Sequence, residues 1–383
     1  MKAKTFEPKK TKRYSMPTKA YFGRNSLQLL GNIIVEKSIH SALLVCGEHF
    51  KKSDDYRQVI SNLKETPIDV YNEKIKRSDF STINRIVTYC RKYRYEAIIA
   101  IGGGSVLDTA KCAAILTTHK GLIEEYLVSK SKKITAKGLL YIAIPTTAGT
   151  GTEVTPWATV WGDNKRKYSL YSKGFMFPAI AIVDSHLTDS LNQKDTATSG
   201  MDALCQAIEA YWNKHHNRQS DIYALEAISV IRTNLENAVR NPTKKIRDRM
   251  AWGSFMQGLA FSNTQTTICH AVSYPLTARW GVTHGQATSV TLPSFMRGII
   301  PALPKNRQKH LLSALNAHTP ALGANVVEQL MIRIGLKIKL SALGITKENI
   351  NVIIEDSFYT NRVNNIPLQY DKQRLKRFLV AIY

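Results

Sequence analysis

Four residues in the second half of the sequence offer the chemistry of a metal site: a carboxylate, an amide and two imidazoles. Asp202 and Gln206 are spaced i, i+4 in a stretch with helical periodicity, so both side chains lie on one face of the expected helix. His270 and His284 follow later in the chain. A carboxylate with two imidazoles suits Zn²⁺ or Fe²⁺ with a coordination position left open. Each histidine taken singly is also explained by a structural role, so the spacing leaves both interpretations open.

Two further segments have the composition of nucleotide-binding loops. In the first, the apolar run Ala97 to Ile101 leads into three glycines and a serine at 102–105, and a helical pattern follows. Glycines let the backbone approach a phosphate closely, and a helix N-terminus presents unpaired N–H groups. The spacing matches neither GxGxxG nor the Walker pattern, so a glycine-rich structural turn remains an alternative on this feature alone.

The second segment, 145–153, follows the apolar run Leu139 to Ile144 and contains four threonines and two glycines. Hydroxyls and backbone amides gathered after a parallel strand suit phosphate oxygens or a nicotinamide carboxamide. Since the carboxyl ends of parallel strands meet at one edge of a sheet, the two loops indicate a single crevice and favour a nucleotide site.

Two kinds of hydrophobic pattern divide the chain. Continuous apolar runs in the first half are typical of strands buried on both faces of a parallel sheet. The predicted strands are Ala42 to Cys46, Ile68 to Tyr71, Ala97 to Ile101, Leu139 to Ile144 and Ala179 to Val183. After about Leu187, apolar residues recur at three- and four-residue spacing, which predicts helices. The predicted helices are Gly200 to Lys214, Ile222 to Asn237, Lys245 to Phe261, Lys305 to Asn316 and Val326 to Ile334.

These patterns predict three regions in the chain. They are a flexible basic tail at 1–19, an α/β dinucleotide-binding domain at 20–187 and an all-helical metal-binding domain at 188–383. Clefts between domains are favoured ligand sites, so we expect the loops and the metal ligands to meet there.

The composition limits the classes of protein. The 383 residues, with 44% hydrophobic and 21% charged, describe a folded chain with a sizeable core. No apolar run approaches the ~18 residues that span a bilayer, and five cysteines without a CxxC pair are expected to be buried thiols. Without a secretory signal pattern, we expect a cytoplasmic protein with no membrane partner. The net charge of +24 lies in scattered runs without a recognised binding module, so no specific nucleic-acid partner is predicted.

The two loops read GGGSVLDTAK at 102–111 and PTTAGTGTE at 145–153, and with the candidate metal ligands they resemble the iron-containing (group III) alcohol dehydrogenases. The resemblance covers nearly the whole chain after the tail. It implies a Rossmann-like α/β domain followed by an all-α domain, the dehydroquinate synthase-like fold. It also implies NAD- or NADP-dependent interconversion of an alcohol and an aldehyde or ketone. It also implies a homodimer or a larger homo-oligomer.

The resemblance assigns residues to the site. The predicted cofactor-binding residues are Gly47, Gly102, Gly103, Gly104, Ser105, Asp108, Thr146, Thr147 and Thr150. The predicted ligands of the iron or zinc ion are Asp202, Gln206, His270 and His284. The predicted catalytic residues are His270, Tyr274 and Lys167.

Three positions depart from the family pattern. Gln206 stands where the family usually has a histidine, so a nitrogen ligand is replaced by a weaker amide oxygen. Tyr274 stands where a second cleft histidine is usual, which leaves a hydroxyl as the candidate proton donor. Gly47 stands where NAD-preferring members often carry an aspartate, so the 2′-phosphate of NADP is not repelled.

Gln206 in DALCQAIEAYW together with His270 in CHAVSYPLT is similar to the phosphonoacetaldehyde reductases of phosphonate biosynthesis. The resemblance implies reduction of phosphonoacetaldehyde to 2-hydroxyethylphosphonate. A cationic cleft would attract this anionic aldehyde, and the candidate contacts are Lys167, Arg279 and Arg166.

Other functions stay open at this point. Glycerol dehydrogenase and dehydroquinate synthase activities share the glycine-rich loop, although the threonine-rich loop favours the alcohol dehydrogenase branch. A general short-chain alcohol, aldehyde or polyol dehydrogenase is one alternative. A catalytically silent binding or assembly protein is another, because a metal ligand has been exchanged.

Overall fold

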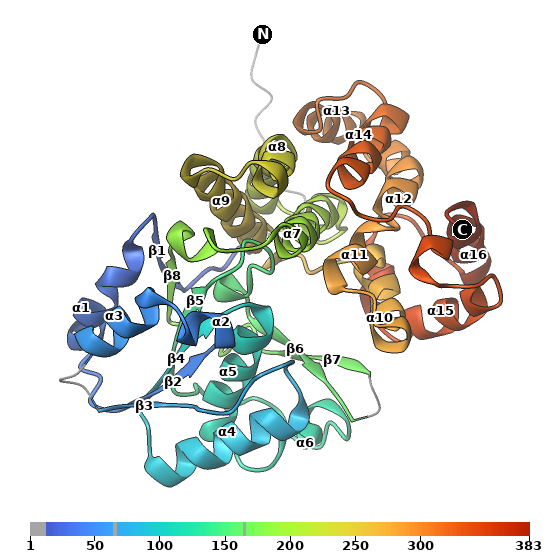
Figure 1. Cartoon of the computed structure of the whole chain (residues 1–383). Coiled ribbons are helices and arrows are strands. Elements are labelled where there is room, and N and C mark those ends of the chain that lie inside the picture. Colours follow the sequence, from blue (N-terminus) through green and yellow to red (C-terminus); the bar gives the residue numbers. More distant parts are fainter. Residues whose placement is uncertain (1–12, 64–66, 164–165) are drawn as a thin grey trace, which may run out of the picture.

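The computed structural model describes residues 13–63, 67–163 and 166–383, and it contains an α/β part followed by a helical part (Figure 1). Within these residues the α/β part has a six-stranded sheet in the order β1-β8-β5-β4-β2-β3, and all neighbouring strands are parallel. The strands are β1 Lys19–Phe22, β2 Ala42–Cys46, β3 Ile68–Val70, β4 Ala97–Gly102, β5 Leu140–Pro145 and β8 Ile180–Val183. Each predicted strand is present, and its ends differ from the prediction by no more than one residue.

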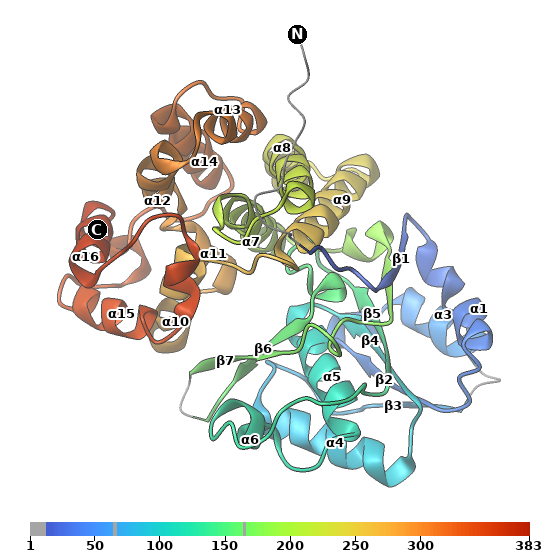
Figure 2. The same cartoon turned by 180° about the vertical axis from the view of Figure 1, so that it is seen from behind.

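The four inner strands β2, β4, β5 and β8 are almost entirely apolar and buried, because helices cover both faces of the sheet (Figures 1 and 2). Along β2, Leu43 and Val45 belong to one hydrophobic cluster, whereas Leu44 and Cys46 belong to another. The helices of the first cluster are α4 Phe80–Tyr93, α5 Gly104–Thr117 and α6 Ile123–Leu127. The helices of the second are α1 Leu30–Glu36, α2 Glu48–Lys51 and α3 Asp54–Asn62.

The helical part packs α7, α8 and α9 against one another, and α10 and α11 against α7. Its helices are α7 Gln193–Trp212, α8 Arg218–Arg240, α9 Lys244–Phe261, α10 Ile268–Trp280, α11 His284–Ser289, α12 Leu292–Ile299, α13 Lys305–Ala314, α14 Pro320–Arg333, α15 Asn349–Ser357 and α16 Lys372–Ala381. Short 3₁₀ helices are η1 Ser26–Leu29, η2 Thr152–Val154, η3 Ser185–Thr188, η4 Ile300–Ala302, η5 Ser341–Leu343 and η6 Asn361–Asn365. The predicted helix at 200–214 begins earlier, because the side chain of Asn192 caps α7.

A two-stranded antiparallel hairpin was not predicted. It consists of β6 Trp157–Trp161 and β7 Lys167–Tyr171, with Trp161 paired to Lys167. Along β6 the residues alternate between buried and partly exposed, so the segment lacks the continuous apolar run that marks the strands of the large sheet. The hairpin matters because it carries Lys167 to the site described below.

The predicted flexible tail at 1–19 is wrong from Tyr14 onward, while residues 1–12 lie outside the described part of the chain. The Tyr14 hydroxyl donates to the Leu259 carbonyl at 3.0 Å, and the Ser15 backbone N–H donates to Asn263 Oδ1 at 2.9 Å. Lys19 begins β1. The prediction relied on the many basic residues of this segment and took no account of Tyr14, whose side chain binds the segment to the helical part.

All five cysteines are buried free thiols, as predicted. Within the described residues, none of the helices combines the length and the apolar character needed to cross a membrane.

Candidate active site

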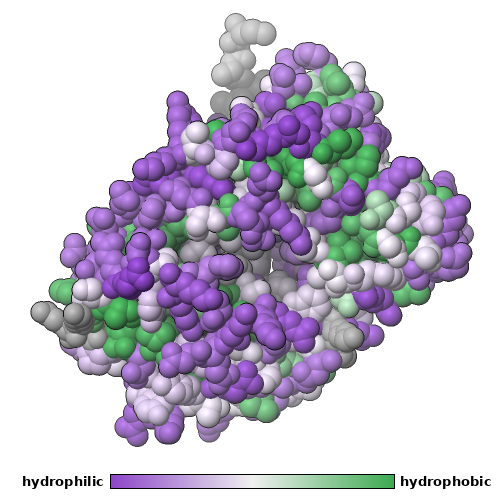
Figure 3. Space-filling model, viewed as in Figure 1, coloured by the Kyte–Doolittle hydropathy of each residue, from purple (hydrophilic) through white to green (hydrophobic). Residues whose placement is uncertain are grey.

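A cavity of about 300 Å³ lies where the loops of the α/β part meet the helical part. Residues from the glycine-rich loop, the threonine-rich loop, the hairpin, α7, α10, α11 and η6 line it. The space-filling view shows the surface hollowed between the two parts of the molecule (Figure 3). The structure brings residues of the two predicted loops and the four predicted metal ligands to one cavity, while their roles in binding stay predictions.

Three of the predicted metal ligands converge on this cavity from three helices. Asp202 comes from α7, His270 from α10 and His284 from the start of α11. One ligand atom from each lies within 4.8 Å of the others. Asp202 Oδ1 lies 3.5 Å from His270 Nε2 and 3.8 Å from His284 Nε2. Burial and the neighbouring Lys167 lower the pKa of His284 to about 3, so its imidazole is neutral, as a metal ligand must be.

Gln206 lies beside this triad on α7. Its Nε2 donates to Asp202 Oδ2 at 2.9 Å, which leaves Oε1 buried and without a hydrogen-bond partner among the described residues. His270 Nε2 is also buried, and it has no hydrogen-bond partner in the described part of the chain, although Asp202 Oδ1 lies 3.5 Å away. A buried polar atom that carries a lone pair but has no partner lowers the stability of the fold unless a ligand or an ion binds it. The carboxylate of Asp202, Nε2 of His270 and Oε1 of Gln206 could therefore act together as ligands of a divalent cation.

Replacing Gln206 with histidine is expected to tighten metal binding by at least about tenfold, because an imidazole nitrogen is a better ligand for Fe²⁺ or Zn²⁺ than an amide oxygen. The measurement is the metal content after dialysis against graded concentrations of chelator. Gln206→Ala is expected to lose metal more readily than the wild type. Identical retention by both variants and the wild type would show that residue 206 is not a ligand.

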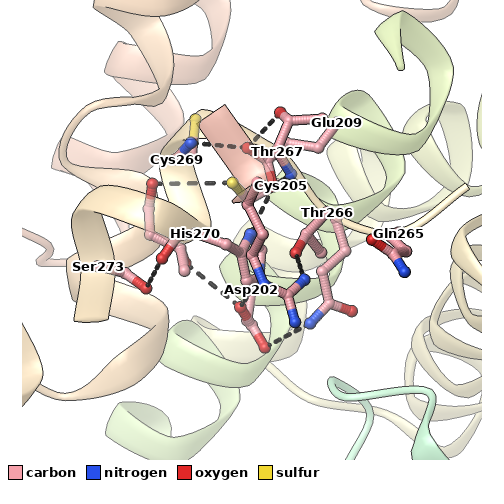
Figure 4. Close-up of polar contacts among 12 residues, drawn as sticks. Asp202, Cys205, Glu209, Gln265, Thr266, Thr267, Cys269, His270 and Ser273 are labelled. Atoms are coloured by element: carbon pink, nitrogen blue, oxygen red, sulfur yellow. Dashed lines mark hydrogen bonds and ion pairs between the residues drawn. The ribbon is translucent and has the colours of Figure 1, made fainter. Parts of the chain in front are cut away.

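Glu209 orients His270 and was missed by the sequence analysis. Its carboxylate accepts from His270 Nδ1 at 2.5 Å, from the Thr267 hydroxyl at 2.6 Å and from the Cys269 backbone N–H at 2.7 Å (Figure 4). Burial alone would raise the pKa of Glu209, but His270 and the hydrogen bonds from Thr267 lower it. With Nδ1 donating to this carboxylate, Nε2 presents its lone pair toward Asp202.

The predicted cofactor loops lie side by side at the carboxyl ends of β4 and β5. Gly104 and Ser105 line the cavity at the start of α5, and Thr150 lines it from the threonine-rich loop. A Cβ on Gly104 would lie 2.7 Å from the Thr150 methyl group, so a side chain at 104 would force the loops apart. The N-terminus of α5 therefore borders the cavity, which suits the binding of a pyrophosphate.

The remaining glycines and threonines predicted to bind the cofactor lie in the same loop cluster but do not line this cavity. The Thr146 backbone N–H donates to the Gly102 carbonyl at 3.0 Å, and a Cβ on Gly103 would contact the Thr147 methyl group at 3.5 Å. A Cβ on Gly47 would lie 3.7 Å from Gly102 Cα. Their contacts with a cofactor stay predictions.

Asp108 lines the cavity, but both of its carboxylate oxygens are engaged within the protein. Oδ1 accepts from the Thr152 hydroxyl at 2.6 Å and Oδ2 from the Thr159 backbone N–H at 2.9 Å. One turn further along α5, Lys111 Nζ donates to the carbonyls of Thr152, Thr155 and Trp157 at 2.6, 2.9 and 2.8 Å. In this structure Asp108 and Lys111 fix the threonine-rich loop and the hairpin to α5.

Glu153, at the end of the same loop, makes stability depend on pH. Burial, partly offset by a backbone hydrogen bond and by Lys111, raises the pKa of Glu153 from 4.5 to about 7. Below pH 4.5 the carboxyl is neutral in both the folded and the unfolded chain. As the pH rises from 4.5 to 7, only the unfolded chain ionises, so the contribution of this group to stability falls and its full cost is reached above pH 7.

Glu153→Gln is therefore expected to stabilise the protein relative to the wild type by on the order of 2 kcal/mol at pH 8, and by much less at pH 5. Urea unfolding of both proteins at the two pH values measures the difference. A stability difference that does not change with pH would contradict this prediction.

Lys167 and Tyr274 are neighbours in the wall of the cavity. Lys167 Nζ lies 3.3 Å from His284 Nδ1 and 5.2 Å from the centre of the Tyr274 ring. Burial lowers the pKa of Lys167 to about 7, with Asp202 opposing the shift. Burial raises the pKa of Tyr274, so the phenol keeps its proton at neutral pH and can donate it.

The other two predicted anion contacts lie outside this cavity. Arg166 and Arg279 line a neighbouring cavity of about 650 Å³, which shares Lys167 and Tyr274 with the first. Arg279 Nε donates to Asp356 Oδ2 at 2.6 Å, so its charge is already paired. Arg362, which the sequence analysis did not identify, lines the first cavity from η6.

Two family models match the sequence. The model of the iron-containing alcohol dehydrogenases matches residues 17–185, and that of the C-terminal part of the same family matches residues 196–383. The chain belongs to the iron-containing alcohol dehydrogenase family. The predicted family, fold class and enzyme class are thereby confirmed, and the prediction of NAD or NADP with a divalent metal agrees with membership of this family.

Named relatives of the enzyme act on different alcohols and aldehydes. It is 31% identical over 318 residues to long-chain-alcohol dehydrogenase 1 of Geobacillus thermodenitrificans, covering 80% of each chain. It is 29% identical over 387 aligned positions to the NADPH-dependent butanol dehydrogenase of Clostridium saccharobutylicum, covering 97% of this chain and 98% of the other. The structure of sulfoacetaldehyde reductase from Bifidobacterium kashiwanohense in complex with NAD⁺ has a TM-score of 0.91 and 30% identity, covering 97% of this chain and 99% of that one.

Proposed function

We propose that the enzyme reduces a short aldehyde with an anionic end, phosphonoacetaldehyde, to 2-hydroxyethylphosphonate, with NADPH or NADH as the reductant. The observation that carries this proposal is the pair of basic side chains, Lys167 and Arg362, beside Tyr274 in the cavity. Lys167 Nζ lies 5.2 Å and the Arg362 guanidinium carbon 5.6 Å from the centre of its ring. An anionic group would be attracted to this wall, next to the metal ligands.

The comparisons support an aldehyde of this class. The sulfoacetaldehyde reductase acts, by its name, on a two-carbon aldehyde with a sulfonate, and its fold matches this chain over nearly the full length. A phosphonate is a similar tetrahedral anion on the same two-carbon frame. The cavity volume of about 300 Å³ suits a substrate of this size beside the nicotinamide.

The residues of the cavity have different roles in the proposed reaction. Asp202, His270 and His284, with Gln206 beside them, would hold a metal that supplies Lewis acidity for negative charge on the carbonyl oxygen. The glycine-rich loop and the start of α5 would hold the pyrophosphate of the cofactor. The reduced nicotinamide, once bound there, would supply the hydride for the carbonyl carbon and would become NADP⁺ or NAD⁺. Tyr274, or a water beside it, delivers the proton that completes the hydroxyl group.

The test is cofactor oxidation with phosphonoacetaldehyde, sulfoacetaldehyde and propanal, using NADPH and NADH with Fe²⁺, Zn²⁺ or chelator. We expect kcat/KM to be highest for phosphonoacetaldehyde. Equal values for propanal and phosphonoacetaldehyde would contradict an anionic substrate and favour a general short-chain alcohol dehydrogenase. A higher value for sulfoacetaldehyde would contradict the phosphonate itself. A homodimer or larger assembly in the cytoplasm stays part of this proposal, and light scattering tests its size.

A further inference from the structure

We infer that Arg362 is the specificity-determining residue that binds the anionic end of the substrate, an inference that rests on the proposed function. Arg362 lies in η6, in the C-terminal part of the chain, and lines the same cavity as His270, His284 and Tyr274. Its ligand would be a tetrahedral oxyanion, a phosphonate or a sulfonate, on the carbon next to the aldehyde.

The guanidinium of Arg362 has capacity to bind such a group. Among the described residues, its only hydrogen bond runs from Nη1 to the Thr266 hydroxyl, and no carboxylate lies within ion-pair distance. A planar fork of N–H donors matches two oxygens of a tetrahedral anion and binds them more strongly than a neutral donor does. Most of these donors are therefore available to a ligand.

The position of Arg362 is fixed by its neighbours. Asn365, in the same turn, donates to the Thr266 carbonyl at 3.1 Å, and its own carbonyl accepts from the Lys214 backbone N–H at 2.8 Å. Val363, in the same turn, is buried. Because Thr266 lies just before α10, which carries His270, the same short segment sets the position of the arginine relative to the metal ligand.

The other cations near the cavity are less suited to this task. Arg279 lies in the neighbouring cavity and is paired with Asp356 at 2.6 Å. Arg166 also lines only that neighbouring cavity, where its guanidinium carbon lies 4.7 Å from the centre of the Tyr359 ring. Lys167 Nζ contacts His284 at 3.3 Å and offers no planar fork. Among the described residues, Arg362 is thus the arginine that lines the cavity of the metal ligands without an ion-pair partner.

The test compares Arg362→Gln, Arg362→Lys and the control Arg279→Gln, which removes an arginine that is already paired. For each protein, kcat/KM is measured with phosphonoacetaldehyde, sulfoacetaldehyde and propanal, and circular dichroism checks the fold. We expect Arg362→Gln to lower the ratio of kcat/KM for phosphonoacetaldehyde to that for propanal at least about tenfold, mainly through KM. Arg362→Lys should recover part of this loss, and Arg279→Gln should leave the ratio within about threefold.

A second measurement needs no turnover. Methylphosphonate carries the anion without the aldehyde, and calorimetric titration should show weaker binding to Arg362→Gln than to Arg279→Gln. A wild type without preference for either anionic aldehyde would overturn the proposed function. A wild type with this preference, together with an Arg362→Gln variant that keeps the ratio and the methylphosphonate affinity, would overturn the role of Arg362 alone. An equal fall for both anionic aldehydes supports recognition of the shared oxyanion.

Discussion

Replacing His270 with alanine is expected to lower kcat for aldehyde reduction at least about a thousand-fold and to release most of the bound metal. His270 supplies one of the two imidazoles of the ligand set, and its buried Nε2 has no hydrogen-bond partner within residues 13–63, 67–163 and 166–383. Lewis-acid assistance is worth several kcal/mol, and about 4 kcal/mol corresponds to a factor of a thousand in rate. Steady-state kinetics and metal analysis on the same preparation measure both effects.

Glu209→Gln provides a graded companion to this variant. The amide keeps the shape of the side chain but loses the carboxylate that accepts from His270 Nδ1 and Thr267. Loss of such a partner typically costs 10–100-fold in metal affinity or activity, so this variant should lie between the wild type and His270→Ala. Binding of NADPH, followed by fluorescence, checks that the α/β part is intact. Full activity of His270→Ala without bound metal would contradict metal-assisted reduction.

The second large effect is expected for Lys111→Met, which should destabilise the protein by roughly 3–6 kcal/mol. Lys111 is 2% exposed, and its ammonium donates to three backbone carbonyls that methionine cannot satisfy. Each buried acceptor left without a donor costs about 1–3 kcal/mol. Because one of those carbonyls belongs to Thr152 in the threonine-rich loop and another to Thr155 just after it, the loop should loosen and the affinity for NADPH should fall. Urea unfolding and fluorescence titration measure the two effects.

Lys120→Met is the matched control for this prediction. Lys120 is an exposed residue that follows the end of α5. Its substitution should therefore change the free energy of unfolding by no more than about 0.5 kcal/mol. Similar unfolding midpoints for the two variants would contradict a structural role for Lys111.

The sequence predicted best those features that depend on local pattern. Continuous apolar runs located five of the six strands of the large sheet, because strands covered on both faces need no polar residues; β1, which begins at Lys19, was not predicted. The hairpin escaped because β6 alternates buried and partly exposed residues over only five positions. Among the site residues, Asp202 and Gln206 were found by helical spacing, and Glu209 lies on the same face of α7, so extending that spacing by one turn could have identified it.

Arg362 carried no such signal. It lies in a short 3₁₀ turn without periodicity, and its place in the cavity depends on long-range contacts of its segment with Thr266 and Lys214. Conversely, Arg279 and Asp108 had the right residue type, but the structure pairs each of them within the protein. Residue type and spacing indicate which groups could act, whereas packing decides which of them are free to do so.

The reactivity of the five buried cysteines can report local unfolding of the enzyme. Burial raises the pKa of Cys46 and Cys90 to about 12 and that of Cys269 to about 11, so the folded chain holds almost no reactive thiolate. Alkylating reagents can therefore modify these residues only during transient unfolding. Since Cys90 and Cys269 belong to different parts of the molecule, their separate labelling rates would show whether the α/β and helical parts open together or independently.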